Sequence, residues 1–418
     1  AEDFIMQRGS SATDGAMLAG TLLGEGTKVG KQFSSENSLF FANSEGFHSE
    51  VCSVFAGPYT VTHHRSTLLI AGLFSFYNAG SGTNQSNHMY KLGPVHQGIL
   101  ERGCKTGSFS YLLWPSRVGA FTAVIGKHYS NFDTTDFPFS YVNEEDGKSV
   151  LVPAMNFFTV GTLRDGRKWP ARDRRTAEDK LDLITFDVLS PYTAQKMRRA
   201  VERLAELKAN ADRSQEYVSC GGTQVKRLLL KTCSRYYGLA LDKYYGDVLV
   251  RRAGDNPGTS LGDLLSPAPT GCGGDSEWVD LCGLLCPKSR VDALCADIAS
   301  GAVADQDTLR ARLQEIHAAY REDEWNWFLA ATGIRSSDAA AELLTKWQAS
   351  SIKLLHMVLN DAEKEFEGTV RTGFGIDGEA GADFEAVRGT FDGNSFVSDL
   401  RQEIEAVTKT YETLRVRV

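Results

Sequence analysis

The first third of the chain repeats a pattern six residues long, in which an aliphatic residue is followed by glycine and four further residues. LGEGTK and VGKQFS run consecutively over residues 23–34, and VGAFTA (118–123) and IGKHYS (125–130) repeat them with a slip of one residue. Hexapeptide repeats of this kind build a parallel β-helix. The aliphatic residue points into the narrow core, and glycine relieves crowding at a corner. The pattern therefore predicts a parallel β-helix over residues 1–160.

The middle of this region fits the repeat less well. FHSEVC, SVFAGP and YTVTHH (47–64) keep the length of six residues but lose the glycine, so an antiparallel β-sandwich stays open as the alternative. Residues 78–98, NAGSGTNQSNHMYKLGPVHQG, interrupt the repeat. We expect this segment to be a loop inserted into the coil.

A helical pattern replaces the repeat after about residue 176. Ser190 and Pro191 are suited to the N-cap and first position of a helix. The last helix carries a heptad stripe, which predicts packing against another helix; its residues are Leu400, Ile404, Val407, Tyr411 and Leu414. We expect a basic connector over 161–189 and a helical domain over 190–418, interrupted by a Gly/Pro-rich loop at 251–275.

Composition and charge exclude several classes of function and support a division into two domains. Residues 1–160 hold 23 charged residues and the remaining 258 hold 75, which supports two domains of different character. The net charge of −8 argues against general nucleic-acid binding. No apolar run approaches the length of a membrane span. The eight cysteines are sparse and lack paired CxxC spacing, so we expect reduced thiols, no metal and a cytoplasmic location.

Several features together resemble a known group of proteins. They are the glycine-marked hexads, TDFPFSYV (135–142) after the last coil, the segment RDGRKWPARDRR (164–175) and the long helical tail. The chain resembles large uncharacterised hexapeptide-repeat proteins that are grouped as a domain of unknown function and are common in anaerobic gut bacteria. The resemblance covers most of the chain. It implies that the β-helix is left-handed, and it supplies no activity.

The wider hexapeptide-repeat superfamily implies more about chemistry. Many of its members are acyltransferases that use acyl-CoA or acyl carrier protein. They are usually trimers, with a histidine base in the groove between neighbouring β-helices. Other members cap sugar nucleotidyltransferases or serve as non-catalytic scaffolds.

The histidines are the candidate bases for such a reaction, because a neutral imidazole has a pKa near working pH. Adjacent residues of a strand point to opposite faces, so His63 and His64 cannot both serve one external site. If Val61 points inward, His63 does too, which favours His64 as the base. His88 and His96, in the interrupting segment, are the alternates.

Five other polar residues are candidates for substrate binding. Asn87 and Lys91 lie in the interrupting segment and would position the substrate. His128 and Asn131 follow the last coil, where a polar cap of the stack is the alternative role. In the basic connector, Lys168 and its neighbour Arg167 could hold a phosphate, although a salt-bridged connector is the plainer interpretation.

Two main hypotheses follow. In the first, the protein transfers an acyl group, with acyl-CoA as donor, to a sugar or a nucleotide-linked acceptor, and forms a homo-oligomer, most simply a trimer. In the second, the β-helix is a non-catalytic module that binds a sugar nucleotide or a partner protein. A third, weaker hypothesis is the cap portion of a sugar nucleotidyltransferase.

Overall fold

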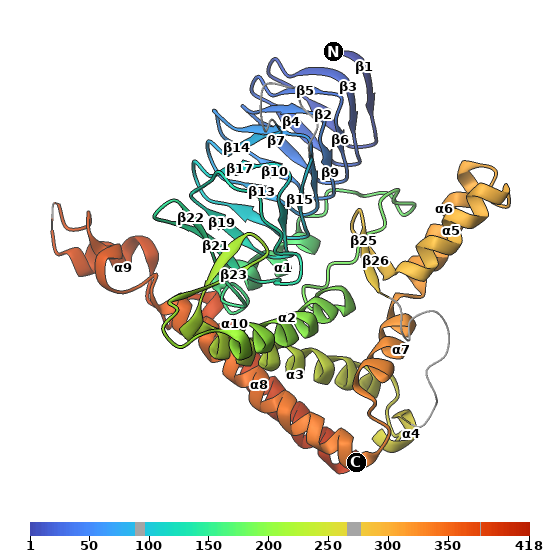
Figure 1. Cartoon of the computed structure of the whole chain (residues 1–418), viewed down its shortest axis with the longest axis vertical. Coiled ribbons are helices and arrows are strands. Elements are labelled where there is room, and N and C mark those ends of the chain that lie inside the picture. Colours follow the sequence, from blue (N-terminus) through green and yellow to red (C-terminus); the bar gives the residue numbers. More distant parts are fainter. Residues whose placement is uncertain (88–96, 266–276, 377) are drawn as a thin grey trace.

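The computed structural model describes residues 1–87, 97–265, 277–376 and 378–418. The N-terminal part is a parallel β-helix, and the part that follows is mainly helical (Figure 1). This confirms the predicted fold class. The antiparallel sandwich is excluded, because strands of successive turns pair in parallel throughout the coil.

The strands of the β-helix stack into three faces. The first face contains β1 (Glu2–Met6), β3 (Met17–Leu23), β6 (Leu39–Phe40), β9 (Phe55–Ala56), β12 (Gly72–Phe74), β15 (Gly98–Leu100) and β18 (Arg117–Val118). The second face contains β5 (Ser34–Glu36), β8 (Glu50–Cys52), β11 (Leu68–Ile70), β14 (Asn84–Ser86), β17 (Tyr111–Leu113) and β20 (Lys127–His128). Strand β3 joins these two faces, since its first half pairs with β5 and its last residues pair with β6.

The third face continues beyond the coil. It contains β2 (Ser11–Ala12), β4 (Lys28–Gly30), β7 (Glu45–Phe47), β10 (Val61–Thr62), β13 (Asn78–Ala79), β16 (Lys105–Thr106) and β19 (Ala123–Ile125). Two hairpins extend it, formed by β21 (Tyr141–Glu145) with β22 (Lys148–Val152) and by β23 (Tyr217–Cys220) with β24 (Thr223–Lys226). The β22–β24 pairing ties the end of the coil to the helical part.

The register shows where extra residues enter the coil. On the third face Glu45 pairs with Val61 and Val61 with Asn78, so these turns are 16 and 17 residues long. Asn78 then pairs with Lys105, 27 residues further on. The prediction that the whole segment 78–98 leaves the coil is wrong at its start, because β13 and β14 lie within it and keep the register.

The corner between the first and third faces has a left-handed backbone in every turn. We call its residues the corner ladder: Gly9, Gly26, Asn43, Tyr59, Phe76, Gly103, Phe121 and Phe139. The backbone N–H of each one after the first donates to the carbonyl that precedes the ladder residue of the turn before. Most side chains resist a left-handed conformation. Here the aromatic members stack in pairs, Tyr59 on Phe76 at 5.3 Å and Phe121 on Phe139 at 4.8 Å between ring centroids.

The chain that leaves the coil packs back against this corner. Trp169, near the end of α1 (Val160–Ala171), lies 4.6 Å from Phe76 and 6.0 Å from Phe121 between ring centroids. Arg102 is fully buried; its guanidinium lies 4.1 Å from the Phe76 ring centroid and donates to the backbone carbonyl of Thr185. The corner ladder is therefore the surface that holds the connector.

The remaining elements are mainly helical. They are α2 (Pro191–Asn210), α3 (Leu230–Asp255), α4 (Leu261–Leu265), α5 (Lys288–Ser300), α6 (Gln306–Ala318), α7 (Tyr320–Thr332), α8 (Ser337–Glu363), α9 (Ala380–Arg388) and α10 (Ser395–Leu414). A short hairpin, β25 (Trp278–Leu281) and β26 (Leu284–Pro287), lies between α4 and α5. Three 3-10 helices cover Arg227–Leu229, Gly368–Arg371 and Arg415–Arg417.

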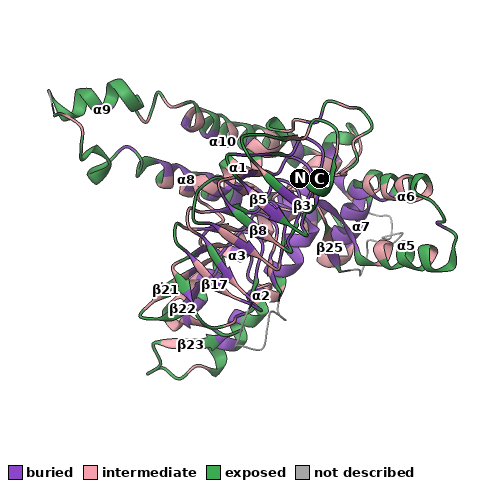
Figure 2. Cartoon of the chain, turned by 90° about the horizontal axis from the view of Figure 1, so that it is seen from above, coloured by how far each residue is buried: buried purple, intermediate pink, exposed green. Residues whose placement is uncertain are grey.

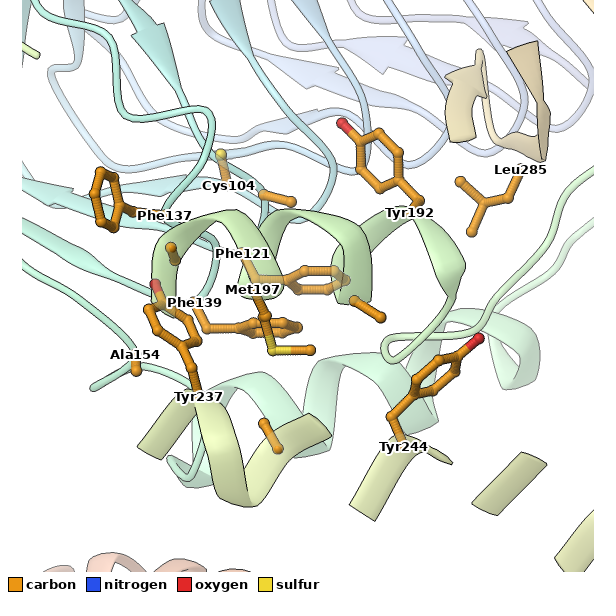
Figure 3. Packing of buried hydrophobic residues seen from close by; sticks show 14 of the residues in the cluster. Cys104, Phe121, Phe137, Phe139, Ala154, Tyr192, Met197, Tyr237, Tyr244 and Leu285 are labelled. Carbon is orange, nitrogen blue, oxygen red and sulfur yellow. The ribbon is translucent and has the colours of Figure 1, made fainter. Parts of the chain in front are cut away.

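Helix α2 joins the β-helix to the helical bundle. It starts as predicted, with Ser190 as N-cap in a capping box. In Figure 3 Met197 of α2 lies beside the rings of Phe121 and Phe139, and Tyr192, at the start of α2, belongs to the same buried cluster. Lys196 pairs with Glu101 at 2.8 Å, and both side chains are largely buried. The heptad stripe of α10 packs on α8, whereas α9 is mostly exposed (Figure 2).

The first prediction compares two phenylalanines with the same backbone conformation. Phe121 and Phe109 have φ of 55° and 58°, and each ring covers a glycine of the turn before. Phe121 is 2% exposed and Phe109 67%. Phe121→Gly should lower the free energy of unfolding by about 3 kcal/mol, because the lost packing outweighs the relief at φ. Phe109→Gly should change it by less than about 1 kcal/mol.

Urea unfolding followed by circular dichroism measures both variants. Equal losses in the two variants would show that the backbone effect of the introduced glycine, and not the lost packing of the connector on the corner ladder, lowers the free energy of unfolding.

Candidate functional site

A polar cleft of about 260 Å³ lies between the third face of the β-helix and helix α1. Its floor is made by the outward side chains of successive strands, Glu45, Val61, Asn78 and Lys105, which the register places in one row. Their neighbours along each strand point into the coil and are buried. The repeat thus brings four residues spread over 60 positions to one surface.

Helix α1 and the residues after it form the wall of the cleft. Asp165, Lys168 and Trp169 line it at intervals of three and four, so they share one face of the helix, and Arg172, the C-cap residue of α1, also lines the cleft. Arg174 follows the helix and also lines the cleft. Arg172 and Arg174 lie in the basic segment that sequence analysis connected with phosphate binding, although neither was singled out.

The charges in the cleft are unbalanced. Lys105 pairs with Asp165, and Arg174 pairs with Glu45. Lys168 and Arg172 also line the cleft, and their side chains make no hydrogen bond or ion pair within the described ranges. With four Lys/Arg against two carboxylates among its lining residues, the cleft is positive in a chain of net charge −8. Such a local excess attracts an anionic ligand.

The surroundings of Lys168 lower the pKa of its amine. Partial burial lowers the pKa of this amine, and the neighbouring cations Arg164 and Arg172 lower it further, against the opposing effect of Asp165. A negative charge bound near Lys168 would relieve this repulsion.

A histidine–carboxylate pair lies on the floor of the same cleft. Nε2 of His63 is 2.6 Å from Oε2 of Glu45. The hydrogen bond from His63 lowers the pKa of Glu45 to about 2, burial opposes this effect, and Arg174 adds to the lowering. When Nε2 carries the proton that Glu45 accepts, Nδ1 is left as a proton acceptor. The arrangement can therefore orient His63 as a general base.

His64 was preferred as the base on the condition that Val61 points into the coil, and the structure contradicts this condition. Thr62, not Val61, faces the interior: it is 1% exposed, and its hydroxyl lies 2.6 Å from that of Ser49. His63 consequently lies on the same side as the cleft. His64 is exposed and does not line the cleft; its ring centroid is 6.5 Å from that of His63.

Of the residues predicted in the interrupting segment, Asn87 lies within the described part of the chain. His88, Lys91 and His96 lie outside the described residues. Asn87 is 6% exposed, and its Oδ1 makes no hydrogen bond within the part of the chain that the structure describes. Asn87 is not among the residues that line the cleft.

His128 and Asn131 stabilise the end of the coil. His128 is 1% exposed, with Nδ1 2.8 Å from the hydroxyl of Ser149, and burial lowers its pKa. The amide of Asn131 donates to the carbonyl of Pro115 at 2.9 Å. These contacts agree with the capping role that sequence analysis kept as the alternative.

Arg167 and Lys168 are separated by helix geometry. Arg167 pairs with Glu403 of α10 and lines a second cavity on another side of α1. This cavity has a volume of about 270 Å³ and lies among α1, α3, α8 and α10. Its walls combine apolar side chains, such as Phe158 and Leu355, with charged ones, such as Lys243 and Asp247. Of the two basic residues predicted to hold a phosphate, only Lys168 faces the basic cleft.

The described residues contain no cluster of potential metal ligands. No three His, Cys, Asp or Glu side chains there are placed to hold a metal ion. Cys282 and Cys286 lie in or beside the β25–β26 hairpin, while Cys295 is exposed on α5; all three are free thiols. Cys272 lies outside the described residues. None of the described helices is both long and apolar enough to cross a bilayer.

Two protein-family models match the chain. Residues 1–208 match a domain of unknown function, DUF4954, and residues 260–418 match a second one, DUF6819. The first match includes the β-helix, the connector and most of α2, and therefore the whole cleft. The second covers the helices from α4 onward.

A relative in Treponema pallidum (strain Nichols) is similar to part of the chain. This uncharacterized protein is 29% identical over 163 residues, which is 37% of this chain. The chain covers 22% of the relative's own length. Neither its name nor the family descriptions assign a reaction.

The Glu45–His63 pair predicts a pH dependence of stability. The pKa of Glu45 is lowered from 4.5 to about 2 in the folded protein, so the pair stabilises the fold above pH 4.5 and loses this effect as pH falls toward 2. The free-energy advantage of the wild type over Glu45→Gln should therefore shrink over that range. Unfolding at several pH values measures it, with Glu50→Gln on the second face as control. Parallel curves for wild type and Glu45→Gln would contradict the pairing.

Proposed function

We propose that the cleft binds a small molecule carrying a phosphate group and that His63 acts there as the general base of a group-transfer reaction. The observation that carries this proposal is the juxtaposition in one cleft of the His63–Glu45 pair with two cations, Lys168 and Arg172, that have no described partner. The β-helix fold is compatible with this chemistry, and the matched families carry no assigned activity.

The phosphate part rests on charge and geometry. Arg172 offers a planar guanidinium suited to two parallel hydrogen bonds, and Lys168 lies one helical turn before it as a compact charge. Charge-assisted hydrogen bonds to such groups contribute about 1.5–3 kcal/mol each. Lys105 and Arg174 add to the field but are already paired with carboxylates.

The transfer part rests on His63. Acyl transfer requires a base that removes the proton of the attacking hydroxyl or amine. The proposed donor is acyl-CoA and the proposed acceptor a sugar or a nucleotide-linked sugar, as the wider superfamily suggests. At about 260 Å³ the cleft is slightly smaller than sites for drug-sized ligands. It would hold one phosphorylated portion of such a molecule, and the remainder would extend into solvent.

The second candidate function is binding without catalysis. The His63 ring packs 5.3 Å from that of Phe47, and the second oxygen of Glu45 is held by Arg174. Both contacts would also be expected of a histidine that only shapes the floor of a ligand site. The two candidates share the phosphate site and differ in whether His63 takes part in turnover.

Binding is tested first, by thermal shift with inorganic phosphate, a sugar phosphate and acetyl-CoA. A ligand at a hundred times its dissociation constant adds about 2.7 kcal/mol of stability. Replacing Lys168 or Arg172 by Met should weaken binding about tenfold or more, because each removes a charge-assisted contact. Lys208→Met, at an exposed position of α2, is the control. If no phosphate-bearing ligand shifts the transition, the proposed phosphate site is wrong.

Catalysis is tested with the two adjacent histidines. His63→Gln should lower acyl transfer from acetyl-CoA to a sugar phosphate about a hundredfold or more while binding is kept, because the general base is lost. His64→Gln should leave the rate unchanged. A wild-type protein that binds but shows no turnover, or a His63→Gln variant with full turnover, would favour the binding module.

A further inference from the structure

Lys168 has an environment that none of the other cleft lysines or arginines shares in the described structure. Lys105 and Arg174 each have a carboxylate partner, and Arg172 is exposed. Lys168 is half-buried on the wall of the cleft without a described hydrogen bond or ion pair. Its charged neighbours are mostly of the same sign.

Cationic neighbours and partial burial change the chemistry of an amine. Both favour its neutral form, since each raises the cost of a positive charge at Nζ. They act here in the same direction and lower the pKa of Lys168. Only the neutral amine has the lone pair needed to attack a carbonyl carbon, and lysines placed beside other cations are activated in this way.

We propose that Lys168 is a nucleophilic amine that forms an imine with a phosphorylated aldehyde or ketone bound in the cleft. The proposal rests on the phosphate site described above. It does not depend on acyl transfer or on His63 as its base.

The geometry indicates the class of carbonyl compound. Arg172 is the C-cap residue of α1, its backbone N–H donates to the carbonyl of Lys168, and the side chains of both residues line the cleft. A phosphate held by Arg172 would leave the rest of a small molecule beside the Lys168 amine. A carbonyl compound without a phosphate would lack this anchor.

The reaction balances without a further reagent. The Nζ lone pair attacks the carbonyl carbon, and the carbonyl oxygen takes up a proton, so that a carbinolamine forms. Loss of the hydroxyl group as water, with loss of the remaining proton from nitrogen, gives the imine. One amine and one carbonyl group are consumed, and one water molecule is released.

The test uses pyridoxal 5′-phosphate as a phosphorylated aldehyde and pyridoxal as its unphosphorylated counterpart. Each is incubated with the full chain, and borohydride then delivers hydride to the imine carbon and fixes the adduct as a secondary amine. Mass spectrometry of the peptides locates and quantifies the label. With pyridoxal 5′-phosphate, Lys168 should be labelled about tenfold more than the exposed Lys208, because a charge-assisted contact from Arg172 to the phosphate holds the aldehyde beside Lys168.

Two controls separate this inference from the phosphate site. Inorganic phosphate should suppress labelling of Lys168, and pyridoxal should label it about tenfold less, because one charge-assisted contact is lost. Lys168→Arg keeps the positive charge; it should still bind phosphate in the thermal-shift assay but lose the label at this position. Arg172→Met should lower labelling while Lys168 is intact.

The outcomes are distinct. Phosphate binding with Lys168 labelled no more than Lys208 would overturn the imine proposal and leave the phosphate site standing. Strong labelling by both aldehydes, unaffected by phosphate, would overturn the phosphate anchor and with it the proposed substrate class. Selective labelling of Lys168 that phosphate suppresses would support both.

Discussion

The left-handed corner between the first and third faces is the constraint on which the rest of the structure depends. Each turn reverses there with a positive φ, and the backbone hydrogen bonds of the corner link one turn to the next. Gly9, Gly26 and Gly103 meet this requirement without a Cβ, and Asn43 tolerates it. In the later turns Tyr59, Phe76, Phe121 and Phe139 do so, and their stacked rings form the surface on which Trp169 packs. The same residues that close each turn thus fix helix α1, and α1 forms the wall of the cleft.

This corner also explains how far the fold could be predicted from the sequence. The hexads at 23–34 and 118–130 predicted the β-helix because glycine and aliphatic residues mark its corners and core. The hexad glycines Gly24 and Gly119 lie two residues before the corner ladder, where a Cβ would come within 2.7 and 2.4 Å of the next turn's backbone. The ladder positions themselves do not require glycine, because asparagine tolerates the left-handed region and stacking compensates the aromatic residues. A search for glycine at fixed spacing therefore missed turns that are regular in three dimensions, including the start of the segment 78–98.

The site was less predictable, for a definite physical reason. The sequence argument used strand alternation to separate His63 from His64, but β10 ends at Thr62 and both histidines are exposed. The argument also depended on which strand residue faces the core. The residue that faces the core is Thr62, which the sequence did not indicate. A polar side chain can be buried there because the Ser49 hydroxyl lies within hydrogen-bond distance of its own hydroxyl. The cleft itself joins residues from strands of four turns to a helix some 60 residues later. The basic segment 164–175 supplied the one local signal, and helix periodicity then divided its cations between two cavities.

The position of α1 between these two cavities has a thermodynamic consequence. Asp165 and Lys168 of α1 line the basic cleft, whereas Thr162, Leu163 and Arg167 of the same twelve-residue helix line the second cavity against α3, α8 and α10. Any molecule that displaced α1 from one side would change affinity on the other side by some factor, and linkage requires the effect to be the same in the reverse direction. The connector would then transmit binding between the β-helix and the helical bundle.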